Sequence, residues 1–109
     1  MVPNLREFRM LFERVPDGHV LSRERPGSRS KLGGTPRWEQ TDETPHCAHC
    51  HREMTFIGQI DSIEHDDEHN PRRVDCLSPN QQYMFGDVGM IYVFFCFECL
   101  HPTAVFQCG

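Results

Sequence analysis

Two Cys-x-x-C motifs constrain the fold of this chain more than any other feature. They are Cys47-Ala-His-Cys50 and Cys96-Phe-Glu-Cys99, separated by 45 residues in a chain of 109. A two-residue gap lets the backbone curl so that both sulfurs point at one ion, and four thiolates form a closed tetrahedral zinc site. A chain of this length has room for one small domain, which a bound metal would stabilise. We therefore predict a structural Zn²⁺ ion held by Cys47, Cys50, Cys96 and Cys99.

Other uses of these cysteines are less consistent with the sequence. A single Cys-x-x-C motif also occurs in thioredoxin-type redox sites, but this chain has two motifs and no βαβ pattern. Disulfides need an oxidising compartment, and four buried free thiols are the remaining alternative. A catalytic zinc keeps one coordination position open for water, whereas four thiolates close it. Cys76 and Cys108 lie outside the motifs, and we interpret them as small buried apolar residues.

Several histidines lie near the cysteine motifs. We expect His49, His51 and His101 to shape the loops around the cysteines rather than bind the ion, although one of them could replace a cysteine. The run from His65 to His69 has the composition of a second metal cluster, but charged runs in loops are usually solvated.

Three apolar segments predict β-strands. Met54–Ile60 alternates between apolar and polar side chains, and Met90–Phe97 is a continuous β-branched and aromatic run, typical of a strand buried on both faces. Thr103–Gln107 forms a third short strand after a turn. Residues 62–82 are polar and interrupted by proline, so we expect a long excursion there, with one irregular strand near 74–77.

The N-terminal part of the chain has a different pattern. Residues 4–15 carry apolar side chains at helical spacing, Asn4 can cap the start, and Pro16-Asp17-Gly18 ends the run. This predicts an amphipathic helix whose apolar stripe either packs on the domain or forms a partner-binding face. Residues 18–31 are rich in Ser, Arg, Pro and Gly, which predicts a loop.

The expected fold class is therefore mainly β with an N-terminal helix (α+β). We predict a small antiparallel sheet with a zinc-ribbon-like four-cysteine site. An N-terminal helix and loop would occupy residues 1–30, and the zinc-containing β domain residues 31–109.

Hydropathy and charge indicate in which compartment the protein works and what kind of partner it binds. The longest apolar run has eight residues, far below the roughly 20 that span a bilayer. The first ten residues lack the apolar core of a signal peptide, so we expect a cytoplasmic location. The net charge is +4 for residues 1–37 and −9 for residues 38–109. An acidic body suits a cationic protein partner better than a nucleic acid.

The segment Lys31-Leu-Gly-Gly-Thr-Pro-Arg-Trp38 precedes the first cysteine motif. Gly33 and Gly34 permit positive φ angles, Pro36 fixes an extended path, and Trp38 offers a large apolar side chain. Trp38 either covers the small core or forms, with the glycines, the rim of a peptide-binding site. Phosphate binding is disfavoured, because no predicted strand leads into the glycines and no helix follows them.

The order of these motifs resembles the YwqG-like bacterial proteins and their eukaryotic relatives, the programmed-cell-death-two and Tsr-type ribosomal-protein chaperones, grouped as the TYPP domain. The resemblance covers about residues 31–108. The matching positions are Gly33, Gly34, Pro36, Trp38, Cys47, Cys50, Met54, Phe56, Gln59, Asp87, Gly89, Tyr92, Phe94, Cys96, Cys99, Phe106 and Gln107.

The resemblance implies a β-rich domain that embraces an extended segment of a client protein, and some similar bacterial genes lie among toxin and immunity operons. We expect a non-enzymatic module, most simply an immunity protein that binds a cognate toxin. The alternatives are a chaperone-like binder of a basic client, such as a ribosomal protein, and a nucleic-acid-binding zinc ribbon that uses the Arg-rich residues 23–37. An enzyme is disfavoured, because no nucleophile elbow, H-E-x-x-H motif or phosphate loop is present. The expected partner-binding residues are Gly33, Gly34, Pro36, Trp38, Phe56, Gln59 and Asp87.

Overall fold

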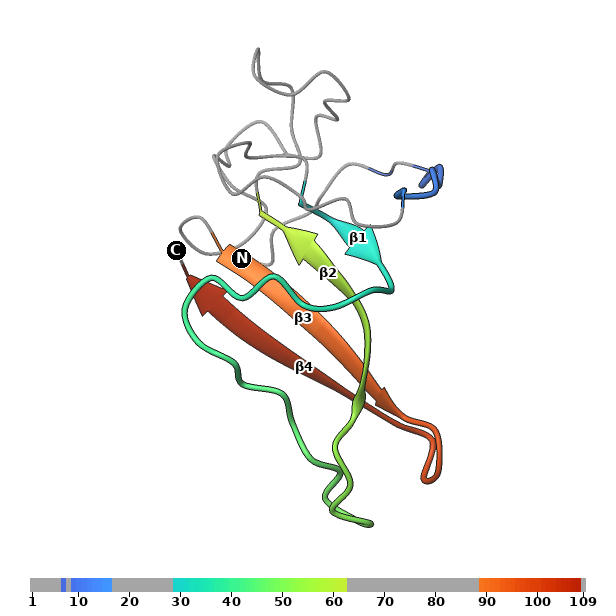
Figure 1. The fold of residues 1–109 in the computed structure, drawn as a ribbon, viewed down its shortest axis with the longest axis vertical. Helices are drawn as coiled ribbons and strands as arrows, with labels where there is room; N and C mark the ends of the chain where they lie inside the picture. The colour runs from blue at the N-terminus through green and yellow to red at the C-terminus, as the bar shows by residue number, and fades with distance from the viewer. Residues whose placement is uncertain (1–6, 8, 17–28, 63–88, 109) are drawn as a thin grey trace.

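The structure is a computed structural model that describes residues 7, 9–16, 29–62 and 89–108. These residues contain one antiparallel sheet with the strand order β1-β2-β3-β4 (Figure 1). The strands are β1 (Lys31–Leu32), β2 (Thr55–Asp61), β3 (Gly89–Cys96) and β4 (His101–Cys108). The three predicted strands are confirmed as β2, β3 and β4, with ends that differ by one or two residues. β1 was not predicted, because two residues are too few to show an alternation.

The central strand β3 supplies most of the core. Met90, Tyr92, Phe94 and Cys96 are buried, whereas the residues between them are half-buried. The prediction that this strand is buried on both faces therefore holds fully for only one face. The buried apolar residues form a single cluster: Cys47, Met54, Met90, Tyr92, Phe94 and Cys96.

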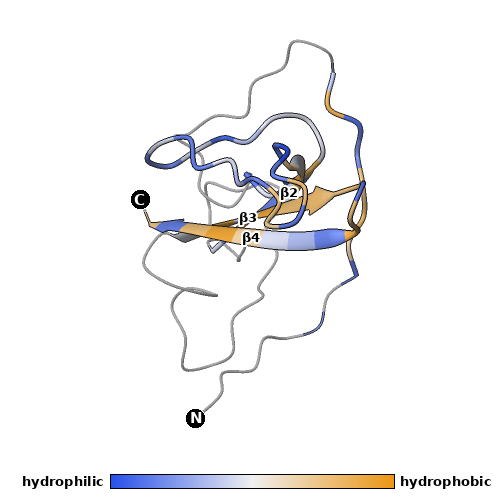
Figure 2. Cartoon of the chain, turned by 90° about the horizontal axis from the view of Figure 1, so that it is seen from below, coloured by the Kyte–Doolittle hydropathy of each residue, from blue (hydrophilic) through white to orange (hydrophobic). Residues whose placement is uncertain are grey.

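A coil segment covers this buried face. We call residues 33–45 the strap; it crosses the sheet from β1 towards β4 and lies on one side of it (Figures 1 and 2). The strap begins with Gly33 and Gly34, whose φ angles of 79° and 76° lie in the left-handed region. Trp38 packs on the core, with ring centroids 4.4 Å from Tyr92 and 5.9 Å from Phe94. Trp38 therefore covers the core, as one of the two sequence interpretations proposed.

Buried polar side chains of β2 and β3 hold the strap backbone. Gln59 accepts a hydrogen bond from the Arg37 amide (3.0 Å) and donates one to the Arg29 carbonyl (2.8 Å). The Tyr92 hydroxyl accepts from the Glu39 amide (2.8 Å) and donates to the Arg37 carbonyl (2.7 Å). The bonds to Arg37 and Glu39 satisfy strap backbone groups that lie over the sheet, and the bond to Arg29 holds the chain just before β1.

β4 holds the strap in the same way. Gln107 accepts from the Gln40 amide (2.9 Å) and donates to the Thr41 carbonyl (2.7 Å). Gln40 in turn donates through its side-chain amide to the Cys108 carbonyl (2.7 Å). One side chain from each of the three long strands thus hydrogen-bonds the strap, which fixes its path across the sheet.

A buried ion pair fastens the chain before β1 to the end of β2. Arg29 Nε donates to Asp61 Oδ2 at 2.6 Å, and the Arg29 guanidinium also contacts Glu39. Burial disfavours the charge of Arg29, but the hydrogen bond and charge of Asp61, with the charge of Glu39, outweigh it and raise the Arg29 pKa. The Asp61 amide donates to the Ser30 hydroxyl (2.8 Å).

The predicted N-terminal helix is wrong. Residues 7 and 9–16 contain no helix, and Met10, Leu11 and Phe12 are exposed by 77%, 88% and 73%. An isolated helix of about twelve residues is marginal in water, so it forms only when its apolar face packs against another element. Here these side chains are exposed rather than packed on the described sheet, and the described part of the chain is all β rather than α+β.

Other expectations fall outside the described residues. These are the irregular strand near 74–77, Cys76, the His65–His69 run and Asp87. No helix among the described residues is long and apolar enough to cross a membrane.

The hydrogen bonds between the Tyr92 hydroxyl and the strap predict the effect of removing that hydroxyl group. We expect Tyr92→Phe to lower the free energy of unfolding by about 1–3 kcal/mol, because it leaves the Glu39 amide and the Arg37 carbonyl without their partner. Chemical denaturation followed by Trp38 fluorescence measures this. Thr103→Ser, at an exposed position of β4, is the control and should change stability by less than about 0.5 kcal/mol. A Tyr92→Phe protein as stable as the control would show that these bonds do not hold the strap.

Candidate metal centre

The four motif cysteines meet at one end of the sheet. Their sulfur atoms all lie within 4.8 Å of one another, and the sulfurs of Cys50 and Cys96 are 3.7 Å apart. A tetrahedron with metal–sulfur bonds of about 2.3 Å has edges of about 3.8 Å, so this spacing suits zinc. Cys47 and Cys96 are buried, and Cys50 and Cys99 are half-buried. The prediction that both motifs converge on one possible metal site is confirmed.

Each motif forms the same backbone turn. The His51 amide donates to the Cys47 carbonyl at 2.8 Å, and the Leu100 amide donates to the Cys96 carbonyl at 2.8 Å. His51 and Leu100, the residues that follow each motif, have φ angles of 63° and 58°. Because the intervening side chains differ between the motifs, the backbone bonds and the left-handed residue define the turn. We call these two turns knuckles.

Neighbouring elements place the two knuckles side by side. The second knuckle is the turn that joins β3 to β4, and the first joins the strap to β2 (Figure 1). The first is closed by a bridge between His46 and Glu53 and by a bond from the Cys47 amide to the Arg52 carbonyl (2.8 Å). The Arg52–Glu98 ion pair (3.1 Å) links the knuckles, but both side chains are exposed, so its contribution to stability is small.

The protein environment lowers the pKa of one motif thiol and raises the pKa of another. Backbone amides of Cys50 and His49 lower the pKa of Cys47 to about 6. The pKa of Cys99 rises to about 12, because it is desolvated and lies beside the sulfurs of Cys47 and Cys50. At neutral pH without metal, Cys47 is therefore a thiolate and Cys99 a thiol.

The structure places the nearby histidines beside the cysteine cluster. The rings of His49 and His101 stack across the two knuckles with centroids 4.4 Å apart. Among the described residues, the group that could hold an ion consists of cysteines alone. Cys108 lies at the far end of β4, half-buried and outside this group.

The residues predicted to bind a partner lie in two places. Gly33, Gly34, Pro36 and Trp38 belong to the strap, whereas Phe56 and Gln59 belong to β2. Phe56 packs edge-on against Phe94 with centroids 5.5 Å apart, and Gln59 is buried beneath the strap. The structure thus gives Phe56 and Gln59 contacts within the domain.

Sequence reasoning from residue patterns missed the polar contacts that hold the strap. Tyr92 and Gln107 entered only as positions of the family resemblance, and the Arg29–Asp61 pair was not predicted. The available signal was the presence of polar residues within the apolar strand patterns, because such a residue needs a hydrogen-bond partner when it is buried.

Comparisons with family models, curated proteins and solved structures found no match. The resemblance to the YwqG-like proteins therefore stays a prediction, and the interpretation of the metal centre rests on its geometry.

The cluster predicts the metal content of cysteine variants. We expect wild-type protein purified with zinc to hold one ion per chain, and Cys96→Ser to lose it and unfold at a lower temperature. Cys108→Ser is the matched control, because Cys108 is half-buried, as Cys50 and Cys99 are, but lies outside the cluster. Elemental analysis and thermal melts measure both effects. A Cys96→Ser protein with full zinc content and an unchanged melting temperature would refute the site.

The shifted pKa values of Cys47 and Cys99 predict how many protons are released when zinc binds. Thiolates bind the metal, so each protonated cysteine must release its proton. At pH 7.5 Cys47 is already deprotonated, so we expect the protein to release fewer than four protons for each zinc ion bound. At pH 5.5, which is below the Cys47 pKa of about 6, we expect the number of protons released per ion to rise by up to one. Zinc affinity should fall as the pH falls. Calorimetry in buffers of different ionisation enthalpy measures the release, and an identical count at both values would contradict the lowered pKa.

Proposed function

We propose that this chain is a non-enzymatic protein-binding module whose fold is held by a structural zinc ion. Four thiolates would fill every position around a tetrahedral ion and leave none for a substrate or catalytic water. In this proposal the ion supplies rigidity, and the binding surface lies on the sheet.

The edge strand β4 is the observation that carries the proposal. In the described sheet β4 pairs only with β3, and it contains no Asp, Glu, Lys or Arg. Natural sheets usually protect long edges with charges, short strands or covering loops, because unpaired backbone groups there can pair with another chain. β4 has eight residues, whereas the opposite edge strand β1 has two. An extended segment of a partner can therefore add to the sheet along β4.

The sheet face opposite the strap would contribute apolar contacts. The strand register places Phe106, Ile91 and Ile60 in one row across this face, and Ala104 beside Val93 in the next. Phe106 and Ile60 are about half exposed, at 50% and 45%. A segment that pairs with β4 would place every second side chain on this face, and the nearest of them would contact the half-exposed ring of Phe106.

Charge favours a basic partner. The chain has a net charge of −5, and Asp42 and Glu43 of the strap are exposed acidic residues. Opposite charge speeds encounter and excludes partners of the wrong sign. Together with the resemblance to proteins found among toxin and immunity operons, this supports a cognate toxin as the partner.

A charge substitution on β4 tests the proposal. We expect wild-type protein to capture one basic protein in stoichiometric amount from native lysate, and Ala104→Lys to lose it at least tenfold. Thr55→Lys is the matched control, because it adds the same charge at another exposed strand position, away from β4. Mass spectrometry identifies the partner, and melting curves check that both variants fold.

Each outcome has a separate meaning. A toxin domain supports the immunity role, whereas a ribosomal protein as the sole partner would replace it with a chaperone-like role. Equal capture by both lysine variants would exclude β4 as the binding edge. Retention of RNA or DNA at low salt, without a protein, would overturn the proposal.

A further inference from the structure

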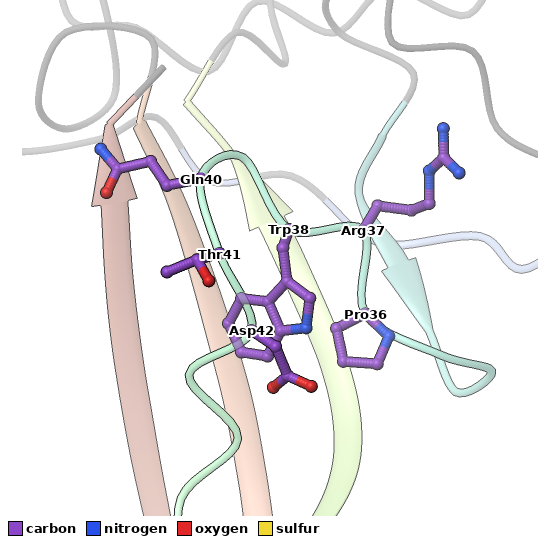
Figure 3. Close-up of a pocket in the computed structure, with 6 residues that line it drawn as sticks. All are labelled: Pro36, Arg37, Trp38, Gln40, Thr41 and Asp42. Carbon is purple, nitrogen blue, oxygen red and sulfur yellow. The ribbon is translucent and has the colours of Figure 1, made fainter.

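A shallow pocket opens on the outer side of the strap. It is lined by Pro36, Arg37, Trp38, Gln40, Thr41 and Asp42 (Figure 3). In Figure 3 the Asp42 carboxylate lies just below the Trp38 indole, the Pro36 ring lies to the right of the indole, and the side chains of Arg37 and Gln40 point away. The pocket therefore combines an aromatic surface with a negative charge.

The Trp38 side chain contributes both to the core and to the pocket. The indole lies nearly parallel to the Phe94 ring, at 15°, with the centroids 5.9 Å apart. One indole face is thereby turned to the core, and the half-buried side chain also lines the pocket. The face of an indole ring carries negative electrostatic potential and is the strongest natural partner for a cation.

Asp42 is held in place without losing its charge. Its Oδ1 atom accepts hydrogen bonds from the Thr44 amide (2.9 Å) and the Thr44 hydroxyl (2.6 Å). These two bonds lower the pKa of Asp42, so the carboxylate is ionised at neutral pH. Among the described residues, no basic side chain forms an ion pair with Asp42.

The pocket lies beside the C-terminal end of the proposed binding edge. Gln107 of β4 donates to the Thr41 carbonyl, and Gln40 donates to the carbonyl of Cys108. Thr41 and Gln40 are themselves pocket residues. A segment paired with β4 would therefore pass close to the pocket, within reach of a long side chain.

We propose that the pocket formed by Trp38, Pro36 and Asp42 receives an arginine side chain of the partner; this rests on the proposed function. A guanidinium group is planar, stacks on an indole face and can donate to Oδ2 of Asp42, the carboxylate oxygen that Thr44 does not occupy. Lysine offers only a point charge, so the pocket distinguishes the two cations.

A small probe tests the pocket without the partner. Trp38 is the only tryptophan of the chain, so its fluorescence reports on the pocket. We expect N-acetyl-arginine amide to quench it in a saturable manner, N-acetyl-lysine amide to bind more weakly, and the neutral isostere N-acetyl-citrulline amide not to bind. Added salt should weaken arginine binding.

Two isosteric variants locate the charge that matters. Asp42→Asn keeps the oxygen that accepts from Thr44 and should weaken arginine binding about two- to fivefold. Glu43→Gln removes the neighbouring charge, which does not line the pocket, and should change binding less than the Asp42 variant. Equal quenching by arginine and citrulline amides, or equal loss in both variants, would overturn the proposal.

The same variants separate the pocket from the proposed function. If Asp42→Asn captures the partner as well as wild type does, the protein-binding function stands and the arginine pocket is excluded. If the arginine amide binds but wild-type protein captures no protein from lysate, the pocket is real as a cation site and the proposed function fails.

Discussion

Four sulfur atoms meet where the two knuckles of the chain lie side by side, and a metal ion bound there would join them. The first knuckle ends the strap, and the second joins β3 to β4. Among the described residues, an exposed ion pair and a stacked histidine pair also link the knuckles. Cys47 and Cys96 are also two of the six buried apolar residues in the described part of the chain. The candidate metal site is therefore part of the core. In a domain this small, an ion there would replace hydrophobic surface that the chain does not have.

The strap covers the sheet with irregular backbone, whose polar groups need hydrogen-bond partners. A helix satisfies its own backbone groups, whereas a coil over an apolar face must find partners below it. Gln59, Tyr92 and Gln107 provide them, and Trp38 fills the space between strap and sheet. The thirteen coil residues of the strap thus cover the buried face of the sheet.

Under the proposed function, the second knuckle and the strap would hold β4 in place for a partner. Its first residue follows the second knuckle, and Gln107 near its end is bonded to the strap. Both ends of the strand are thus fixed, while the edge between them has no paired strand in the described sheet. A preformed edge avoids the entropy cost of ordering a binding strand, so most of the backbone hydrogen bonding can contribute to affinity. The strap adds acidic and aromatic groups at one end of this edge.

Features that depend on residues close together in the sequence could be predicted, whereas features that depend on contacts between distant residues could not. The Cys-x-x-C spacing determines a local turn, and the alternation of β2, the apolar run of β3 and the short segment of β4 determine their strands, so these features were predicted from the residues alone. Residues 4–15 have an equally clear helical period, but a short helix forms only against a surface, and the described part of this segment is exposed coil. Likewise, the pairing of β1, the Arg29–Asp61 pair and the bonds to the strap join residues 22 to 68 positions apart. Only the tertiary structure decided these, because a buried polar side chain shows its need for a partner in the sequence but not which partner the fold brings to it.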